Sequence, residues 1–236
     1  WEALEDAMEF GDVDVPIRVS IGIDGDHLIA DFTDSADQVA ANFNAVDAVT
    51  RSCLYYAVRV ATDPSIPANG GCYRPLDLRT RPGSVVSASD GVAVAAGNVE
   101  TSQRIADVLL GALAQAAPGR VPAASQGTMN NLTIGGEGWS YYETLGGGLG
   151  ATRSSDGQSG RQVHMTNTRA TDVEVLETRF PVRVRRFSLR RGSGGTGARA
   201  GGEGGVREIE MLQPAQASLL ATRRGRGAPG LDGGGQ

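Results

Sequence analysis

The number and clustering of its glycines are the features of this sequence that most constrain which folds it can adopt. The 236-residue sequence holds 34 glycines, more than the usual share, and they form clusters such as 146–150 and 192–197. A glycine has no Cβ, so such runs let the backbone approach another backbone or a ligand closely. The runs flank strand-like segments, so we expect some of their glycines to have positive φ angles or close backbone contacts.

Hydrophobic periodicity predicts helices and strands in the first part of the chain. Alternating apolar residues over 15–23 and 27–32, joined by a turn containing glycine, predict a β-hairpin. Apolar residues at helical spacing predict a helix from 38 to about 61. The clearest helix is expected over 101–117, where one apolar stripe runs along its length.

The pattern changes near residue 130 to short strands separated by glycine loops. Residues 179–191 are expected to be extended, and their apolar side chains switch faces, which predicts a bulge or burial on both faces. Further strands are expected over 206–212 and 217–222. We therefore predict an α+β fold, with a mixed α/β part over 1–130 and a β-rich, glycine-loop-rich part over 131–236 of the same domain.

Composition excludes several classes of function. The 22 basic residues are all arginine, so a Walker A phosphate loop and a lysine Schiff base are excluded. The formal charge of −5 argues against a nucleic-acid partner, and no long apolar run indicates a membrane span. The start of the chain is acidic and unlike a signal peptide, so a cytoplasmic location is expected. Two cysteines and no HExxH motif predict no metal site within this chain.

Polar side chains cluster in two loops beside the glycine runs. One follows the strand-like segment near 140, and the other contains His164, one of only two histidines in the chain. Loops of this kind are better placed to line a cleft than to fill a core. The candidate catalytic residues are Glu143 and His164, and the candidate substrate-binding residues are Asn98, Glu100, Thr144, Asn167 and Thr168.

Several segments, in order along the chain, carry a family resemblance. They include Asn69-Gly-Gly-Cys-Tyr-Arg-Pro75, Gly97-Asn-Val-Glu-Thr-Ser-Gln-Arg-Ile105, Glu143-Thr-x-Gly-Gly-Gly-x-Gly-Ala151 and His164-Met-Thr-Asn-Thr168. With these motifs the whole chain resembles the hydantoinase B family. That family includes the B subunit of N-methylhydantoinase, the matching part of 5-oxoprolinase, and a subunit of acetone and acetophenone carboxylases. The similarity to 5-oxoprolinase is greatest.

The resemblance implies ATP-dependent opening of a cyclic amide such as a hydantoin, 5-oxoproline or a lactam. A hydantoinase-A-type partner is then expected to bind ATP and Mg and to phosphorylate the substrate, and the B-type subunit completes hydrolysis. This chain is expected to bind no cofactor itself. B-type subunits begin well before residue 15, with a region that holds a metal in the carboxylase branch. The remainder of the B-type subunit is therefore a second expected partner, and the chain alone is expected to be inactive.

The roles of the candidates stay open at this stage. In a hydrolase Glu143 or His164 would orient the attacking water, while Asn167 and Thr168 would hold a developing oxyanion. Glu143 and His164 would fit a structural role equally well, in which they form hydrogen bonds with buried N–H and C=O groups of the loop backbone. Two other functions also remain open, namely part of an ATP-dependent ketone carboxylase and a non-catalytic assembly segment.

Overall fold

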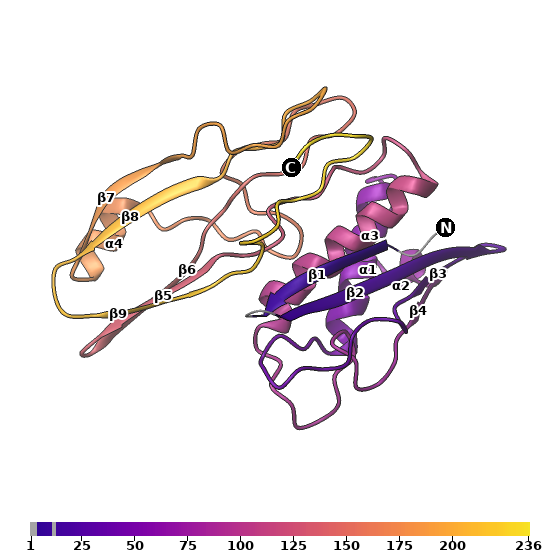
Figure 1. Cartoon of the computed structure of the whole chain (residues 1–236), viewed down its shortest axis with the longest axis horizontal. Helices are drawn as coiled ribbons and strands as arrows, with labels where there is room; N and C mark the ends of the chain where they lie inside the picture. The colour runs from indigo at the N-terminus through magenta and orange to yellow at the C-terminus, as the bar shows by residue number, and fades with distance from the viewer. Residues whose placement is uncertain (1–3, 11–12) are drawn as a thin grey trace.

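The chain folds into two parts of different composition, joined by extended segments (Figure 1). The structure is a computed structural model that describes residues 4–10 and 13–236. The first part combines a sheet with two long helices, and the second is built from strands, one short helix and long loops. The predicted α+β fold is therefore confirmed.

The first part contains a four-stranded sheet in the order β1-β2-β3-β4. β1 pairs antiparallel with β2, β2 pairs antiparallel with β3, and β3 pairs parallel with β4. The predicted hairpin is confirmed as β2 and β3, with Gly25 at φ 61° in the turn. The strands are β1 (Leu4–Phe10), β2 (Val13–Asp24), β3 (His27–Asp31) and β4 (Leu76–Arg79).

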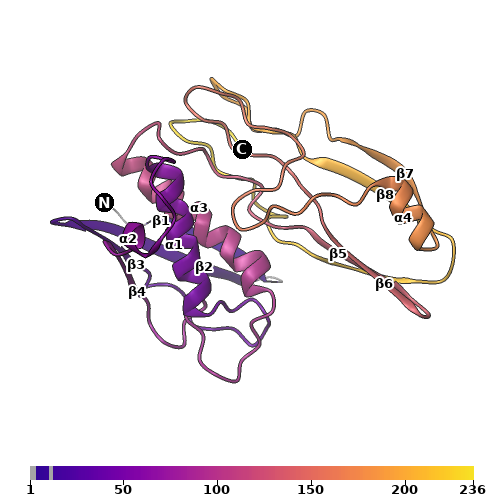
Figure 2. The same ribbon diagram turned by 180° about the vertical axis from the view of Figure 1, so that it is seen from behind.

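Two long helices pack on one face of this sheet, as the opposite views in Figures 1 and 2 show. The helical elements are α1 (Asp47–Ala61), the short α2 (Gly70–Tyr73), a π-helical turn η1 (Gly97–Thr101) and α3 (Ser102–Ala116). β2 supplies the inner face of the sheet, with Val15, Ile17, Val19 and Ile21 buried. Ile23, predicted to share that face, is 56% exposed because it lies at the strand end.

The first long helix begins later than predicted, at Asp47 and not near 38. The side chain of Asn44 accounts for the difference. Its Oδ1 accepts a hydrogen bond from Val39 N at 2.8 Å, and its Nδ2 donates to the carbonyls of Val39, Ala41 and Ala93. A buried amide satisfied in this way holds the preceding segment in a non-helical turn.

The second part contains a three-stranded sheet in the order β6-β5-β9 and a two-stranded ribbon of β7 and β8. Its elements are β5 (Asn131–Gly136), β6 (Trp139–Thr144), α4 (Val173–Arg179), β7 (Val182–Leu189), β8 (Gly205–Met211) and β9 (Gln216–Leu220). The register between β7 and β8 shifts between Val184 and Arg186, so the predicted bulge is confirmed. The extended segment expected from 179 starts at Val182, because α4 includes Arg179.

Glycine loops pack against one another where the two parts meet. A Cβ at Gly148 would lie 1.9 Å from the carbonyl oxygen of Gly202, and a Cβ at Gly150 would lie 1.9 Å from that of Ala123. Gly192 has a φ of 75°. The expectation of close backbone approach and positive φ angles in these runs is therefore confirmed.

We expect Gly150→Ala to lower the free energy of unfolding by about 1–3 kcal/mol, because the new methyl group would overlap backbone that cannot rotate away. Gly22→Ala is the matched control, since a Cβ at Gly22 would meet nothing within 4 Å. Chemical denaturation of both variants tests this. Equal stability of the two variants would contradict the packing described here.

No helix in the described part of the chain is long and apolar enough to cross a membrane.

Candidate functional site

His164 is held in an unusual backbone conformation by a short loop after the glycine run. Its φ is 53°, in the left-handed region, which histidine adopts more readily than most residues that are not glycine. Its ring lies between two other elements. Nε2 is 2.7 Å from Oδ1 of Asp107, and Nδ1 is 3.2 Å from the hydroxyl of Tyr56. The loop thus places one imidazole against both α3 and α1.

Asp107 orients this imidazole from the buried side of α3. Its Oδ1 also accepts a hydrogen bond from Ser125 N at 3.2 Å, and its Oδ2 is 2.9 Å from Nη2 of Arg223. Because an ionised carboxylate can only accept, Nε2–H of His164 donates its hydrogen bond to Asp107. The lone pair of Nδ1 is then left to accept a hydrogen bond from the Tyr56 hydroxyl. A carboxylate behind a histidine in this way selects one tautomer and would stabilise the imidazolium that forms on proton uptake.

The surroundings set the protonation of both partners of His164. Burial of Asp107 opposes its ionisation, but the attraction of His164 and Arg223 together with its hydrogen bonds outweighs burial and lowers the pKa of this carboxyl. Burial raises the pKa of the Tyr56 hydroxyl, and nearby Asp107 adds to the effect. At neutral pH the site therefore presents an ionised Asp107 and a protonated Tyr56.

The lowered pKa of Asp107 predicts a pH dependence of folding. A carboxyl with a depressed folded-state pKa stabilises the fold above its unfolded pKa of about 3.9, and this contribution is lost as the pH falls through the lower, folded-state value. We expect the difference in free energy of unfolding between the parent protein and Asp107→Asn to shrink below about pH 4. Guanidinium unfolding across this acid range measures it, and a difference that grows in acid would refute the assignment.

A buried network of charges extends from Asp107 toward β1. Nη2 of Arg223 also lies 2.6 Å from Oδ2 of Asp6, and Nη1 of Arg104 lies 2.9 Å from Oδ1 of the same residue. Both guanidinium side chains are buried. Arg104 donates further to the carbonyl of Gly127 at 3.0 Å. The network links α3, the first sheet and the last loop of the chain, so it fixes the position of Asp107 from behind.

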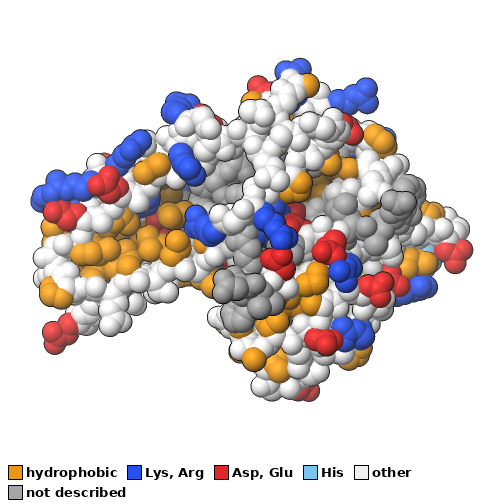
Figure 3. All heavy atoms as spheres, in the orientation of Figure 1, with side chains coloured by type: hydrophobic (Ala, Val, Ile, Leu, Met, Phe, Trp, Pro, Cys, Tyr) orange, Lys and Arg blue, Asp and Glu red, His pale blue; other side chains and the backbone are white. Residues whose placement is uncertain are grey.

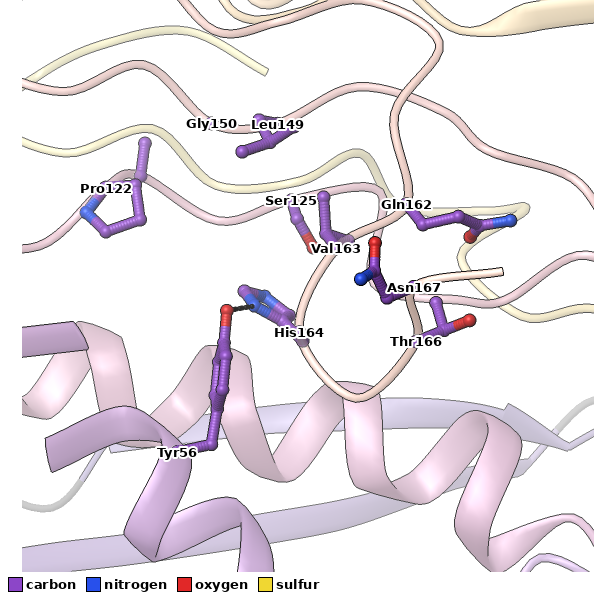
Figure 4. Close-up of a pocket in the computed structure, with 11 residues that line it drawn as sticks. Tyr56, Pro122, Ser125, Leu149, Gly150, Gln162, Val163, His164, Thr166 and Asn167 are labelled. Atoms are coloured by element: carbon purple, nitrogen blue, oxygen red, sulfur yellow. Dashed lines mark hydrogen bonds between the residues drawn. The ribbon is translucent and has the colours of Figure 1, made fainter. Parts of the chain in front are cut away.

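A cavity of about 300 Å³ opens beside the imidazole. Figure 4 shows Tyr56 pointing from its helix toward the ring of His164, with the loops of the second part above them. The cavity is lined by Tyr56, Pro122, Ala123, Ser125, Leu149, Gly150, Gln162, Val163, His164, Thr166 and Asn167. Apolar and glycine residues form much of the wall, while the histidine, the tyrosine and the amides supply polar atoms. Such a site can hold a small molecule next to a group that accepts a proton.

Residues 1–236 match a protein family described as Hydantoinase B/oxoprolinase. The chain belongs to the hydantoinase B/oxoprolinase family. The resemblance inferred from the sequence motifs is thereby confirmed. The 5-oxoprolinase 1 of Arabidopsis thaliana is 45% identical over 230 residues, which cover 98% of this chain and 18% of that protein. The chain thus spans about a fifth of the length of this hydantoinase B/oxoprolinase relative.

Two solved structures share the fold of this hydantoinase B/oxoprolinase chain. The ATP-dependent caprolactamase of Pseudomonas jessenii matches with a TM-score of 0.79 and 24% identity, over 92% of this chain and 40% of that chain. An acetone carboxylase in its nucleotide-free form matches with a TM-score of 0.74 and 19% identity, over 89% of this chain and 29% of the other. At these identities the likeness concerns the fold.

The structure brings three of the predicted residues to or near the cavity. His164 and Asn167 line it. Thr144 lies behind Gln162, which lines the cavity. The hydroxyl and carbonyl oxygens of Thr144 both accept hydrogen bonds from Gln162 Nε2 at 3.0 Å. Thr168 is exposed, and its hydroxyl faces that of Thr166 at 3.4 Å. Their roles in binding stay predictions.

Glu143 lies away from the cavity lining and is buried against Arg207. Its Oε2 is 3.1 Å from Nε of Arg207, a distance suited to an ion pair although the geometry is not that of a hydrogen bond. Its Oε1 accepts a hydrogen bond from Thr171 N at 2.9 Å. Thr171 lies in the segment between the His164 loop and α4, so in this position Glu143 supports loop backbone.

Asn98 and Glu100 also lie outside the cavity lining. Asn98 is exposed in η1 and contributes its carbonyl to the hydroxyl of Ser102. Glu100 is buried and accepts hydrogen bonds from Met129 N, Asn131 Nδ2 and the Thr222 hydroxyl at 2.9–3.3 Å. Burial raises the pKa of its carboxyl. Glu100 therefore ties the two parts together in this structure.

Sequence reasoning did not identify Asp107, Tyr56 or Arg223 as site residues. A signal was present in α3, where Gln103, Arg104 and Asp107 interrupt a helix that is otherwise almost entirely apolar. All three are buried, and a buried charge requires a partner from elsewhere in the fold. The sequence of the helix could have indicated that partners exist, although it does not identify them.

The residues around His164 do not form a metal site. Both carboxylate oxygens of Asp107 are engaged, and the guanidinium of Arg223, 2.9 Å from Oδ2, would repel a metal cation at this carboxylate. Among the residues that the structure describes, no three His, Cys, Asp or Glu side chains converge as metal ligands.

Proposed function

We propose that this chain is part of the B-type subunit of an ATP-dependent cyclic amide hydrolase. The observation that carries the proposal is the Asp107–His164–Tyr56 arrangement beside a small cavity, in a chain of the hydantoinase B/oxoprolinase family. The substrate is a small cyclic amide of the hydantoin, 5-oxoproline or lactam type. The name of the Arabidopsis relative and its 45% identity to this chain support 5-oxoproline as the first compound to test.

The chemistry needs a group that takes a proton from water, and His164 fits this role. Its Nε2 proton is held by Asp107, so Nδ1 is the basic nitrogen and faces Tyr56. In the proposed step the oxygen of water bonds to the amide carbon while one water proton passes to the Tyr56 oxygen. The Tyr56 proton moves to Nδ1, and the imidazolium is stabilised by the Asp107 carboxylate. When the C–N bond breaks, the amide nitrogen takes up a proton and the carbon keeps the phosphorylated oxygen as an acyl phosphate. A second water then hydrolyses this acyl phosphate to the free carboxylate and inorganic phosphate.

Activation of the amide is assigned to a partner. An amide nitrogen is a poor leaving group, so hydrolysis at neutral pH needs a more electrophilic carbon. ATP bound by a hydantoinase-A-type subunit would supply this by phosphorylating the carbonyl oxygen. The remainder of the B-type subunit is the other proposed partner, in keeping with the 18% of the Arabidopsis relative that this chain covers.

The test is turnover by the complete assembly, purified with its partners. We expect ATP-dependent ring opening of 5-oxoproline, a hydantoin or a lactam, measured as appearance of the amino acid or carbamoyl product. Turnover of a ketone that requires bicarbonate would instead establish a carboxylase. Full activity after the polar residues around the cavity are replaced together would establish a non-catalytic assembly segment.

A further inference from the structure

The second part of the molecule has a thin core that is open on one side. The core lies between the sheet of β5, β6 and β9 and the ribbon of β7 and β8. Leu132, Ile209 and Met211 pack against this core but stay partly exposed. Figure 3 shows hydrophobic side chains gathered over β8 and β9 on this side. The residues that the structure describes therefore do not close the layer between the sheet and the ribbon.

β9 carries the most exposed part of this surface. In the register with β5, Leu219 lies opposite Leu132 and Ala217 lies opposite Ile134. Directly opposite residues point to the same face of a sheet, so Leu219 and Ala217 belong to the face that bears the core. Leu219 is nevertheless 54% exposed. We call this apolar surface the β8–β9 strip, and it consists of Leu132, Ile209, Met211, Ala217 and Leu219.

β9 also has a free edge. Within the described chain it pairs only with β5, while β8 pairs only with β7. In an antiparallel strand, every second residue directs its N–H and C=O groups away from the partner strand. On β9 these groups face no strand of residues 4–10 and 13–236. A free edge beside an apolar surface readily accepts an added strand, because main-chain hydrogen bonds and apolar burial then act together.

The charge of the chain is divided unevenly between its two parts. Residues 1–130 contain 8 arginines and 17 acidic residues, a formal charge of −9, whereas residues 131–236 contain 14 arginines and 10 acidic residues, a formal charge of +4. Arg183, Arg185 and Arg186 are exposed on β7, next to β8. Two copies paired strip to strip would bring like charges together. The strip instead favours a segment with acidic flanks.

We propose that an extended segment of the remainder of the B-type subunit adds as a strand at the free edge of β9 and covers the β8–β9 strip. The proposal rests on the proposed function, which assigns that remainder as a partner. The segment has apolar side chains toward the strip and acidic residues at its flanks. The fold shared with the caprolactamase covers 40% of that chain, so a chain with this fold carries further polypeptide that could supply such a strand.

Photocrosslinking in the complete assembly identifies the occupant of the strip. A benzophenone-bearing amino acid is placed at position 219 and, as the matched control, at position 23. Ile23 is 56% exposed at the end of β2, far from the strip in the fold. We expect position 219 to cross-link to an apolar segment with acidic flanks in the remainder of the B-type subunit, and position 23 not to reach that segment. Cross-links from position 219 to a second copy of this chain or to the ATP-binding subunit would overturn the proposal.

Hydrogen–deuterium exchange of the unsubstituted assembly is the second measurement, because the photoreactive side chain could itself disturb the strip. We expect the β9 amides that point to the free edge to exchange at least about 100-fold more slowly than unprotected amides. Exchange as fast as that of the exposed loop 62–71 would show an uncovered edge and overturn the proposal, whatever the cross-linking gives.

Turnover of a cyclic amide by the same preparation separates this proposal from the proposed function. A cross-linked and protected β9 in an assembly that opens no cyclic amide would keep the docking surface and reject the hydrolase. Turnover by an assembly in which β9 exchanges freely would keep the hydrolase and reject the docking surface.

Discussion

Replacing His164 with asparagine is expected to lower kcat for the proposed ring opening by about 100- to 10,000-fold, the usual contribution of a positioned acid or base. Asparagine is chosen because it adopts the left-handed backbone conformation of this position, where φ is 53°. The loop should therefore keep its course while the basic nitrogen facing Tyr56 is lost. Steady-state turnover by the complete assembly, below the melting temperature of the variant, measures the effect.

Two controls separate chemistry from folding for this variant. Loss of the bond between His164 and the buried Asp107 should itself cost about 1.5–3 kcal/mol of stability, so activity must be compared per folded molecule. Phosphorylation of the substrate by the proposed ATP-binding partner should persist in His164→Asn. A decline in activity that only follows the loss of folded protein would assign His164 to the scaffold.

Glu143→Gln provides a contrasting comparison within the same assay. This residue pairs with buried Arg207 and supports Thr171, outside the cavity lining. Its replacement should therefore lower stability first, with activity per folded molecule largely retained. A selective loss of turnover at full stability would instead place Glu143 in the reaction, as its neighbourhood in the sequence first suggested.

Arg223→Gln is expected to reduce the free energy of unfolding by about 3–5 kcal/mol, the typical cost of removing one partner from a buried ion pair. The variant would leave two carboxylates, Asp107 and Asp6, without their shared guanidinium. Arginine and glutamine are both unbranched at Cβ, so the backbone strain at this position, where φ is 60°, should be similar in the parent protein and the variant. Chemical denaturation monitored by circular dichroism gives the difference.

The neighbouring Arg224 supplies the matched control. Its side chain is exposed and donates to Asn130 Oδ1 at 2.9 Å, so Arg224→Gln should cost no more than about 1 kcal/mol. A loss for Arg223→Gln as small as that of Arg224→Gln would show that the buried network contributes little to stability. The position of Asp107 behind His164 would then need another explanation.

Local sequence patterns determined the secondary structure wherever one physical preference dominated. Alternation over 15–23 predicted β2 because a strand that buries one face must repeat every two residues. The stripe from Ile105 to Leu113 predicted α3 for the analogous reason of helical spacing. The change of apolar face within 179–191 predicted the bulge found between Val184 and Arg186. The predicted start of the first long helix near 38 was wrong. The Asn44 side chain, through hydrogen bonds that include one to the distant Ala93, holds the segment before the helix in a turn.

The candidate site depended on contacts that no local pattern contains. The sequence by itself identified His164 and the glycine loops, and its motifs identified the family. Only the tertiary structure joined His164 to Asp107, 57 positions away, and to Tyr56, 108 positions away. Only the tertiary structure showed that Glu143 pairs with Arg207 and lies outside the cavity lining. Buried charges select their partners by position in three dimensions, because desolvation makes any unpaired charge too costly wherever it lies in the sequence.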